Sequence, residues 1–300
     1  MYLLQCRNTK TVQEFESLLR FYGKNAGMEE IMEWLTEMFS YDFLWKAMIV
    51  GGMVALCASL LGVMLVLKRY AMIGDGLSHV CFGALAIALA LQMAPMQVAI
   101  PVVAVAAICL LHLSENSKIK ADSAIGLISS SALAVGVIVN ALSGQTKDLN
   151  SYMFGSILIL EDSQVILSIL LSVIVIAVYL CCYHKIFTLT FDEKFARATG
   201  VAVNFYNMLL AVLTAITIVV GMRVMGTLLI SSLIIFPALT SMQVFTNFRK
   251  VVISSAFVSL FCFFLGFAFS YVLEIPTGAT IVVCNLMVFL GFRIIGRIVV

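Results

Sequence analysis

Residues 71–92 read AMIGDGLSHVCFGALAIALALQ, an apolar stretch long enough to cross a lipid bilayer, and it contains one carboxylate, Asp75, and one imidazole, His79. On a helix, side chains four residues apart share a face, with Cβ atoms about 5–6 Å apart. The two groups can therefore pair with each other or offer ligands to one divalent metal ion. An ionisable side chain inside a membrane span costs roughly 3 kcal/mol on insertion scales, so a pair retained there predicts a functional site.

The rest of the chain has the same apolar character. Of its 300 residues 62% are hydrophobic and only 11% are charged, and the mean hydropathy is +1.10. This composition excludes a soluble globular domain. Spans in lipid that show no strand alternation must be helices, because every backbone polar group needs an internal partner. We expect an all-α bundle of about eight to nine membrane spans, with candidates at 43–67, 71–92, 95–113, 124–143, 164–183, 204–221, 225–245, 251–273 and 279–298.

The first 40 residues differ from the remainder. They carry charges throughout and lack the apolar core of a signal peptide. Residues 29–38 alternate acidic and apolar positions at helical spacing, which favours a helix at the membrane interface. We therefore predict an N-terminal extension over 1–40 and a transmembrane domain over 41–300. An alternative is that residues 1–27 are an upstream extension and that Met28 is the initiator.

Lysine and arginine residues gather in alternate loops between the spans. Cytoplasmic loops of membrane proteins carry the excess of Lys and Arg, so these loops and the C-terminus are predicted to lie in the cytoplasm. The residues in question are Lys68 and Arg69, Lys118 and Lys120, Lys185, Lys194 and Arg197, Arg249 and Lys250, and Arg293 and Arg297.

The segment Thr188–Gly200 is charged and lies between two spans. It is typical of a short helix: Thr190 or Asp192 can cap its start, Glu193 suits the N-terminal end of the helix dipole, and Gly200 can end it. A helix of this kind, with Phe191, Phe195 and Ala198 available to a partner, would suit a contact that receives force. A surface helix without a partner explains the spacing equally well.

Two further residues inside predicted spans are candidates for lining a transport path. Asn140 is a polar side chain in the span 124–143, and Pro237 lies deep in the span 225–245. A proline there frees a backbone carbonyl and predicts a kink. Ordinary helix packing is the alternative interpretation for both residues.

Four segments together resemble the permease subunit of bacterial ABC transporters that take up zinc, manganese or iron. The resemblance runs from about Met28 to the C-terminus and rests on the order and spacing of its motifs. They are Ile73-Gly-Asp-Gly-Leu-Ser-His79, Thr190-Phe-Asp-Glu-Lys-Phe-Ala-Arg-Ala-Thr-Gly200, Gly226 to Ala238, and Pro276-Thr-Gly-Ala279.

The resemblance implies a homodimeric or pseudo-dimeric permease in the bacterial cell membrane, two separate cytoplasmic ATPase subunits and an extracytoplasmic metal-binding receptor. It implies a metal path or gate at Asp75 and His79. The chain has no GxxxxGK[ST] phosphate loop, so we expect a transport subunit rather than an enzyme, with ATP hydrolysed by another chain and no permanently bound cofactor. The resemblance also implies an ATPase coupling segment made of Phe191, Asp192, Glu193, Phe195, Ala196, Ala198 and Gly200.

The transported ion is predicted to be zinc first, with manganese or iron next. Where family members often continue Ser-His-x-x-Leu-Pro-Gly, this chain has Val80-Cys81-Phe82-Gly83, so the proline is missing and a thiol lies near His79. A thiol facing the path would suit zinc, whereas a buried Cys81 would act in packing. Asp75 and His79 can be ligands, a gate or a structural pair. The alternative functions are an ABC permease for a metal chelate such as an iron–siderophore, and an ATP-independent secondary metal carrier.

Overall fold

The computed structural model describes residues 42–116, 121–143, 162–273 and 275–299. By their internal contacts, the residues divide into two units, Met1–Leu44 and Trp45–Val300. The fold described below is that of the second unit. The expected extension over residues 1–40, including the interfacial helix at 29–38, lies outside the described residues. The described ranges contain helices and no strand.

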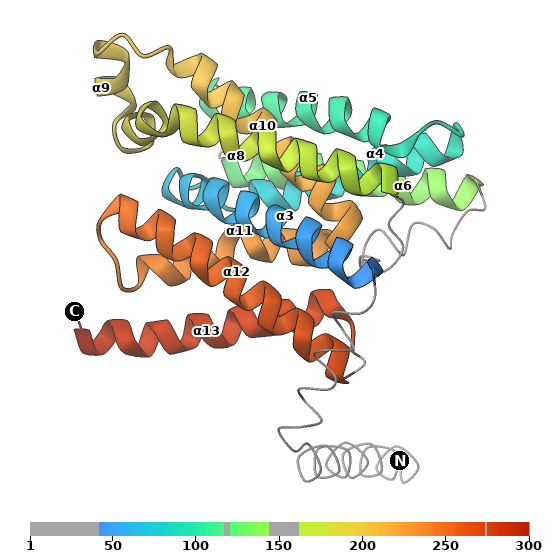
Figure 1. Cartoon of the computed structure of the whole chain (residues 1–300). Helices are drawn as coiled ribbons and strands as arrows, with labels where there is room; N and C mark the ends of the chain where they lie inside the picture. Colours follow the sequence, from blue (N-terminus) through green and yellow to red (C-terminus); the bar gives the residue numbers. More distant parts are fainter. Residues whose placement is uncertain (1–41, 117–120, 144–161, 274, 300) are drawn as a thin grey trace, which may run out of the picture. The chain divides into compact units, whose positions relative to one another are not determined.

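Eight of these helices are long and apolar enough to cross a membrane. This confirms the predicted all-α bundle of transmembrane helices. The predicted span at 225–245 is the exception, because its helix, α11, has only 16 residues and is shorter than the ~20 that a bilayer requires. The helices are α3 Asp42–Leu67, α4 Ile73–Ala90, α5 Pro95–Asn116, α6 Ala121–Ser143, α8 Asp162–Phe191, α9 Glu193–Ala198, α10 Val203–Met225, α11 Thr227–Met242, α12 Phe248–Leu273 and α13 Thr277–Val299 (Figure 1).

Helix α8 is longer than the span predicted at 164–183. It has 30 residues and continues to Phe191, so the beginning of the predicted short helix belongs to α8 instead. Residues 184–191 contain no proline or glycine, and the helix ends only where Asp192 adopts an extended backbone with φ −146° and ψ 100°. The span predicted at 164–183 covers only the apolar stretch, so it lacks the last two turns of α8.

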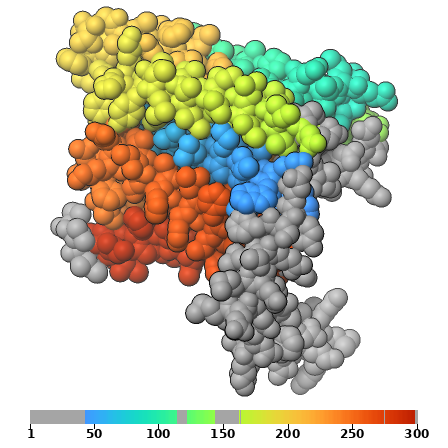
Figure 2. Space-filling model, viewed as in Figure 1, coloured from blue at the N-terminus to red at the C-terminus, as the bar shows by residue number. Residues whose placement is uncertain are grey.

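Helix α3 occupies the interior of the bundle. Ala47, Val50, Ala58 and Val63 are completely buried, and Figure 2 shows α3 lying between α8 and α12. The Oγ atom of Ser259 on α12 donates a hydrogen bond of 2.9 Å to the carbonyl oxygen of Ala55. In lipid, where helix association gains little from the hydrophobic effect, close packing and such hydrogen bonds hold helices together.

Helices α4 and α6 approach each other closely at a pair of small residues. A Cβ atom on Gly83 of α4 would lie 2.7 Å from the carbonyl oxygen of Ala132 on α6, a distance that real Cβ atoms essentially never show. Small residues allow such an approach in membrane helices. Nearer the start of α4, a Cβ atom on Gly76 would likewise lie 2.6 Å from the Cγ2 atom of Ile125 on α6, which lines the candidate site.

Candidate functional site

Asp75 and His79 lie on one face of α4, as the four-residue spacing predicts. The helix begins at Ile73 and continues through Gly74 and Gly76 without interruption, so Asp75 is in its first turn. The Nε2 atom of His79 is 3.7 Å from the Oδ2 atom of Asp75, and their side chains are 26% and 48% exposed. Much of α4 is buried, so these two polar side chains mark the face that this chain leaves uncovered.

The pair faces a cavity of about 280 Å³ between the start of α4 and the first half of α6. On the α6 side, Asp122, Ser129 and Ser130 complete the polar part of its lining. The two hydroxyl groups donate to carbonyl oxygens of their own helix, Ser129 to Ile125 at 2.6 Å and Ser130 to Gly126 at 2.8 Å. Each hydroxyl oxygen keeps its capacity to accept a further hydrogen bond.

Asp122 is the residue of this cavity that sequence reasoning missed. It is an acidic residue in the first turn of α6, and the sequence assigns it to a polar loop next to a predicted span. Its place beside Asp75 depends on how α6 packs against α4, and the spacing along the chain gives no signal for that. The only local signal is a carboxylate at the edge of an apolar stretch.

One chain supplies few ligands for an ion. Among the residues that the structure describes, no group of three or more His, Cys, Asp or Glu side chains is placed to hold a metal. Asp75 and His79 thus form a two-residue set, whereas protein-bound divalent metals take four or more ligands. Cys81 is completely buried and is absent from the cavity lining. Its thiol therefore packs in the interior rather than facing the path.

The two candidate path residues Asn140 and Pro237 lie apart from this cavity. Asn140 is partly buried near the end of α6, and its Oδ1 atom has no hydrogen-bond partner in the described part of the chain. Pro237 is buried inside α11, which continues past it to Met242. Neither residue lines the Asp75–His79 cavity, so a path through either one stays a prediction.

The predicted short helix in the charged segment is present as α9, Glu193–Ala198. The side chain of Asp192 accepts a hydrogen bond of 2.9 Å from the backbone N–H of Phe195, so Asp192 is the cap. Thr190 instead donates to the carbonyl of Ile186 within α8, at 2.7 Å. Gly200 follows the helix with φ +81°, a left-handed conformation that glycine adopts without steric cost.

Helix α9 is anchored by one residue and presents others outward. Ala196 is completely buried in the core cluster that also contains Leu189 and Val203. Phe191 and Phe195, which flank the helix start, are 59% and 58% exposed. Large apolar side chains at the exposed end of a bundle are typical of a docking surface for another protein. Ala198 and Gly200 are also exposed.

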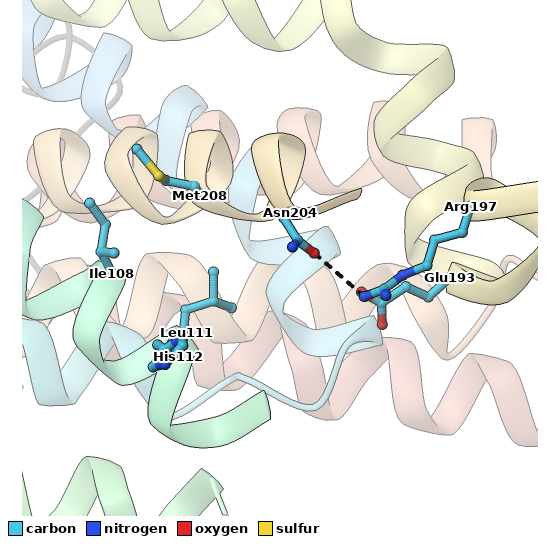
Figure 3. Close-up of a pocket in the computed structure, with 7 residues that line it drawn as sticks. All are labelled: Ile108, Leu111, His112, Glu193, Arg197, Asn204 and Met208. Atoms are coloured by element: carbon cyan, nitrogen blue, oxygen red, sulfur yellow. Dashed lines mark hydrogen bonds between the residues drawn. The ribbon is translucent and has the colours of Figure 1, made fainter. Parts of the chain in front are cut away.

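A second cavity, of about 580 Å³, lies where α5, α9 and α10 meet. Figure 3 shows His112 and Leu111 of α5 on one side and Glu193 and Arg197 of α9 on the other. The Nη2 atom of Arg197 donates to the Oδ1 atom of Asn204 on α10 across 3.4 Å. At the edge of this cavity, α9 therefore contacts α10 through polar side chains.

Comparison with known proteins gives consistent matches over most of the chain. Residues 40–295 match the model of the ABC 3 transport family. The chain is 29% identical over 260 residues to the manganese import system permease protein ScaB of Streptococcus gordonii, covering 87% of this chain and 94% of that protein. It is 31% identical over 265 residues to a probable metal transport system membrane protein of Treponema pallidum (strain Nichols), covering 87% and 99%. Its fold is similar to the solved structure of PsaBC from Streptococcus pneumoniae in complex with Fab, with a TM-score of 0.79, 29% identity and coverage of 87% and 95%.

Proposed function

The chain belongs to the ABC 3 transport family and is the membrane permease of a metal-ion ABC importer, and we propose that Asp75 and His79 bind the ion during its passage. The observation that carries this proposal is an aspartate–histidine pair, partly exposed in the first turns of a membrane helix and facing a cavity that a further carboxylate and two hydroxyl groups also line. Carboxylate oxygen and imidazole nitrogen accept divalent manganese, iron and zinc. A small, loosely held ligand set also suits transport, because the ion must leave again.

Among these metals, manganese is our proposed substrate. The ScaB relative is named as a manganese import permease. Zinc is the first expectation from the sequence because the thiol of Cys81 lies near His79 in the chain. That thiol is completely buried, so it does not favour zinc. A site of carboxylate and imidazole ligands is harder in character than a thiolate site, and hard ligands suit manganese.

A second copy of the permease is proposed to cover the cavity. The side chain of Asp75 is 48% exposed in the single chain, and an ionised carboxylate that faces lipid is unfavourable even near the end of a span. A homodimer that brings two such cavities together would remove the carboxylate from lipid. It would also double the ligand set from one Asp–His pair to two, so that four protein ligands would face one ion.

The ATPase is proposed to bind at α9. This chain has no phosphate loop of its own, and two separate ATPase subunits would dock against the exposed Phe191 and Phe195 beside the capped helix. This arrangement places the α9 end of the bundle in the cytoplasm of a bacterial cell, in agreement with the basic residues Lys194 and Arg197 on that helix. An extracytoplasmic receptor would deliver the ion from the other side.

The cavity favours a bare ion over the two alternative functions. A volume of about 280 Å³ lies below the usual range of about 300–1,000 Å³ for sites that hold drug-sized ligands, so a metal chelate is a poor fit. A capped helix with exposed aromatic residues offers a docking surface for a separate ATPase, which an ATP-driven importer needs and a secondary carrier does not.

Uptake by the reconstituted transporter tests the proposal. Vesicles containing the permease, its ATPase and its receptor are supplied with ATP and with manganese, zinc or iron, and the variant Asp75→Asn serves as control. We expect manganese uptake that the substitution removes. Uptake of zinc alone would keep the site and change the ion, and transport of no free metal would overturn the proposal in favour of a chelate.

A further inference from the structure

A buried amide joins α9 to the segment that leads into α4. Asn207, on the second turn of α10, is 4% exposed. Its Nδ2 atom donates a hydrogen bond of 3.0 Å to the Oε1 atom of Glu193, the first residue of α9. Its Oδ1 atom accepts a hydrogen bond from the Nζ atom of Lys68, the residue that follows the end of α3. One side chain thereby connects two charged groups of opposite sign from segments far apart in sequence.

The chemistry of the two partners fixes the orientation of this amide. An ammonium group can only donate and a carboxylate can only accept, so the oxygen of Asn207 must face Lys68 and its nitrogen must face Glu193. A buried amide loses free energy unless it is hydrogen-bonded on both sides. Movement of Glu193 therefore displaces Asn207, and through it Lys68, unless one of these two hydrogen bonds breaks.

Lys68 belongs to a closely bonded turn that ends in the first turn of α4. The backbone N–H of Lys68 donates to Met64, that of Tyr70 to Leu65 and that of Ile73 to Tyr70, at 2.9, 2.7 and 3.0 Å. Arg69 adopts a left-handed φ of 63°, so the chain reverses within a few residues. The N–H of Gly76 then bonds to Met72 at 3.1 Å. This places Asp75 in the same hydrogen-bonded unit.

We propose that the Glu193–Asn207–Lys68 hydrogen-bond chain transmits displacement of α9 to the start of α4 and thus positions Asp75 during the transport cycle. The inference rests on the proposed function, since it takes α9 as the contact that the ATPase moves. Asn207 and Lys68 are positioning residues that act through the turn rather than by touching the ion. Contiguous polar or packed contacts can carry coupling of this kind between two sites, and this chain supplies them over three side chains.

The structure also provides a matched control on the same two helices. Arg197 of α9 bonds to Asn204 of α10 across 3.4 Å, one turn before Asn207. This contact likewise joins α9 to α10, but it involves neither Lys68 nor the turn before α4. Loss of the Asn204 amide should therefore weaken the contact between the helices without interrupting the connection to Asp75.

The test uses the complete transporter in lipid, with two readouts. Asn207→Leu removes both hydrogen bonds at similar side-chain volume. We expect ATP hydrolysis to continue while the ATP used per manganese ion rises about fivefold or more, the lower limit of typical coupling between sites. Hydrogen–deuterium exchange of residues 69–76 should respond to ATP with vanadate in the unmodified protein and in Asn204→Ala, but not in Asn207→Leu.

A second pair of variants covers the case in which Asn207→Leu does not assemble. Glu193→Gln keeps an oxygen that accepts from Asn207, and Glu193→Ala does not, so we expect Gln to preserve the exchange response and Ala to lose it. Equal responses in these two variants, or an unchanged response in Asn207→Leu, would overturn the inference. If the unmodified transporter moves no metal, the proposed function fails, and the exchange readout still decides whether the hydrogen-bond chain connects α9 to α4.

Discussion

The Nε2 atom of His79 lies 3.7 Å from the Oδ2 atom of Asp75, one turn apart on the exposed face of α4. This separation exceeds that of a normal hydrogen bond, which is about 2.7–3.2 Å. The two side chains are therefore neighbours that are not locked together, and each retains lone pairs for a third party. A metal ion bound in the cavity would be coordinated by both groups and would bring them closer together.

Replacement of Asp75 by asparagine should sharply reduce metal uptake. The amide has nearly the shape of the carboxylate but no charge, so the ion loses its strongest electrostatic partner in the cavity. We expect uptake to fall roughly tenfold or more, since each 1.4 kcal/mol of lost binding is a factor of ten. Unchanged thermal stability and unchanged ATPase assembly of the variant would exclude misfolding as the cause. Normal uptake would mean that Asp75 does not contact the ion.

Replacement of His79 by cysteine should change which metal is preferred. A thiolate is a softer ligand than an imidazole and favours zinc over manganese. We expect the ratio of zinc to manganese uptake to rise in His79→Cys, measured with both metals present in competition. Serine at the same position offers a control of similar size that lacks the soft sulfur. An identical ratio in all three proteins would place His79 outside the path.

Replacement of Asp122 by asparagine should have a smaller effect than the change at Asp75. Asp122 lines the same cavity, but together with Asp75 and His79 it does not form a group that could hold a metal in the described part of the chain. Its charge would attract the ion without binding it directly, an interaction worth up to about 1 kcal/mol at exposed sites. We expect the manganese concentration for half-maximal uptake to rise about two- to fivefold, with the maximal rate unchanged. A loss as large as that of Asp75→Asn would make Asp122 a direct ligand.

Removal of the cap at Asp192 should weaken the contact with the ATPase. The hydrogen bond from Phe195 N–H to Asp192 is worth about 1 kcal/mol to a helix, and α9 has only 6 residues. In Asp192→Ala we expect less ATPase to copurify with the permease. Asparagine is an equally good cap, so Asp192→Asn should behave like the unmodified protein. If alanine and asparagine weaken copurification equally, the charge of Asp192 matters rather than its cap.

Enlargement of Gly83 should destabilise the packing of α4 on α6. Its Cβ atom would lie 2.7 Å from the Ala132 carbonyl oxygen, and overpacking of this kind costs about 1–3 kcal/mol. We expect Gly83→Ala to unfold at a lower temperature in detergent. Gly291→Ala is the matched control, because a Cβ atom there meets nothing within 4 Å and alanine is the better helix former. Equal melting temperatures for the two variants would contradict the close approach.

The sequence by itself determined the features that depend on one helix at a time. An apolar stretch of about 20 residues predicts a span, a four-residue spacing places Asp75 and His79 on one face, and Asp192 can cap the helix that follows it. The end of α8 was the local feature predicted least well, because the apolar stretch ends near residue 183 while nothing between residues 184 and 191 breaks the helix.

Only the tertiary structure decided which residues of different helices meet. Asp122 shares a cavity with Asp75, Asn207 joins Lys68 to Glu193, and Cys81 is buried away from the path. In a chain that is 62% hydrophobic, nearly every face of every helix is apolar, so periodicity does not reveal which face is covered. Close packing at residues such as Gly83 sets the rotation and register of neighbouring helices instead, and that fit exists only in three dimensions.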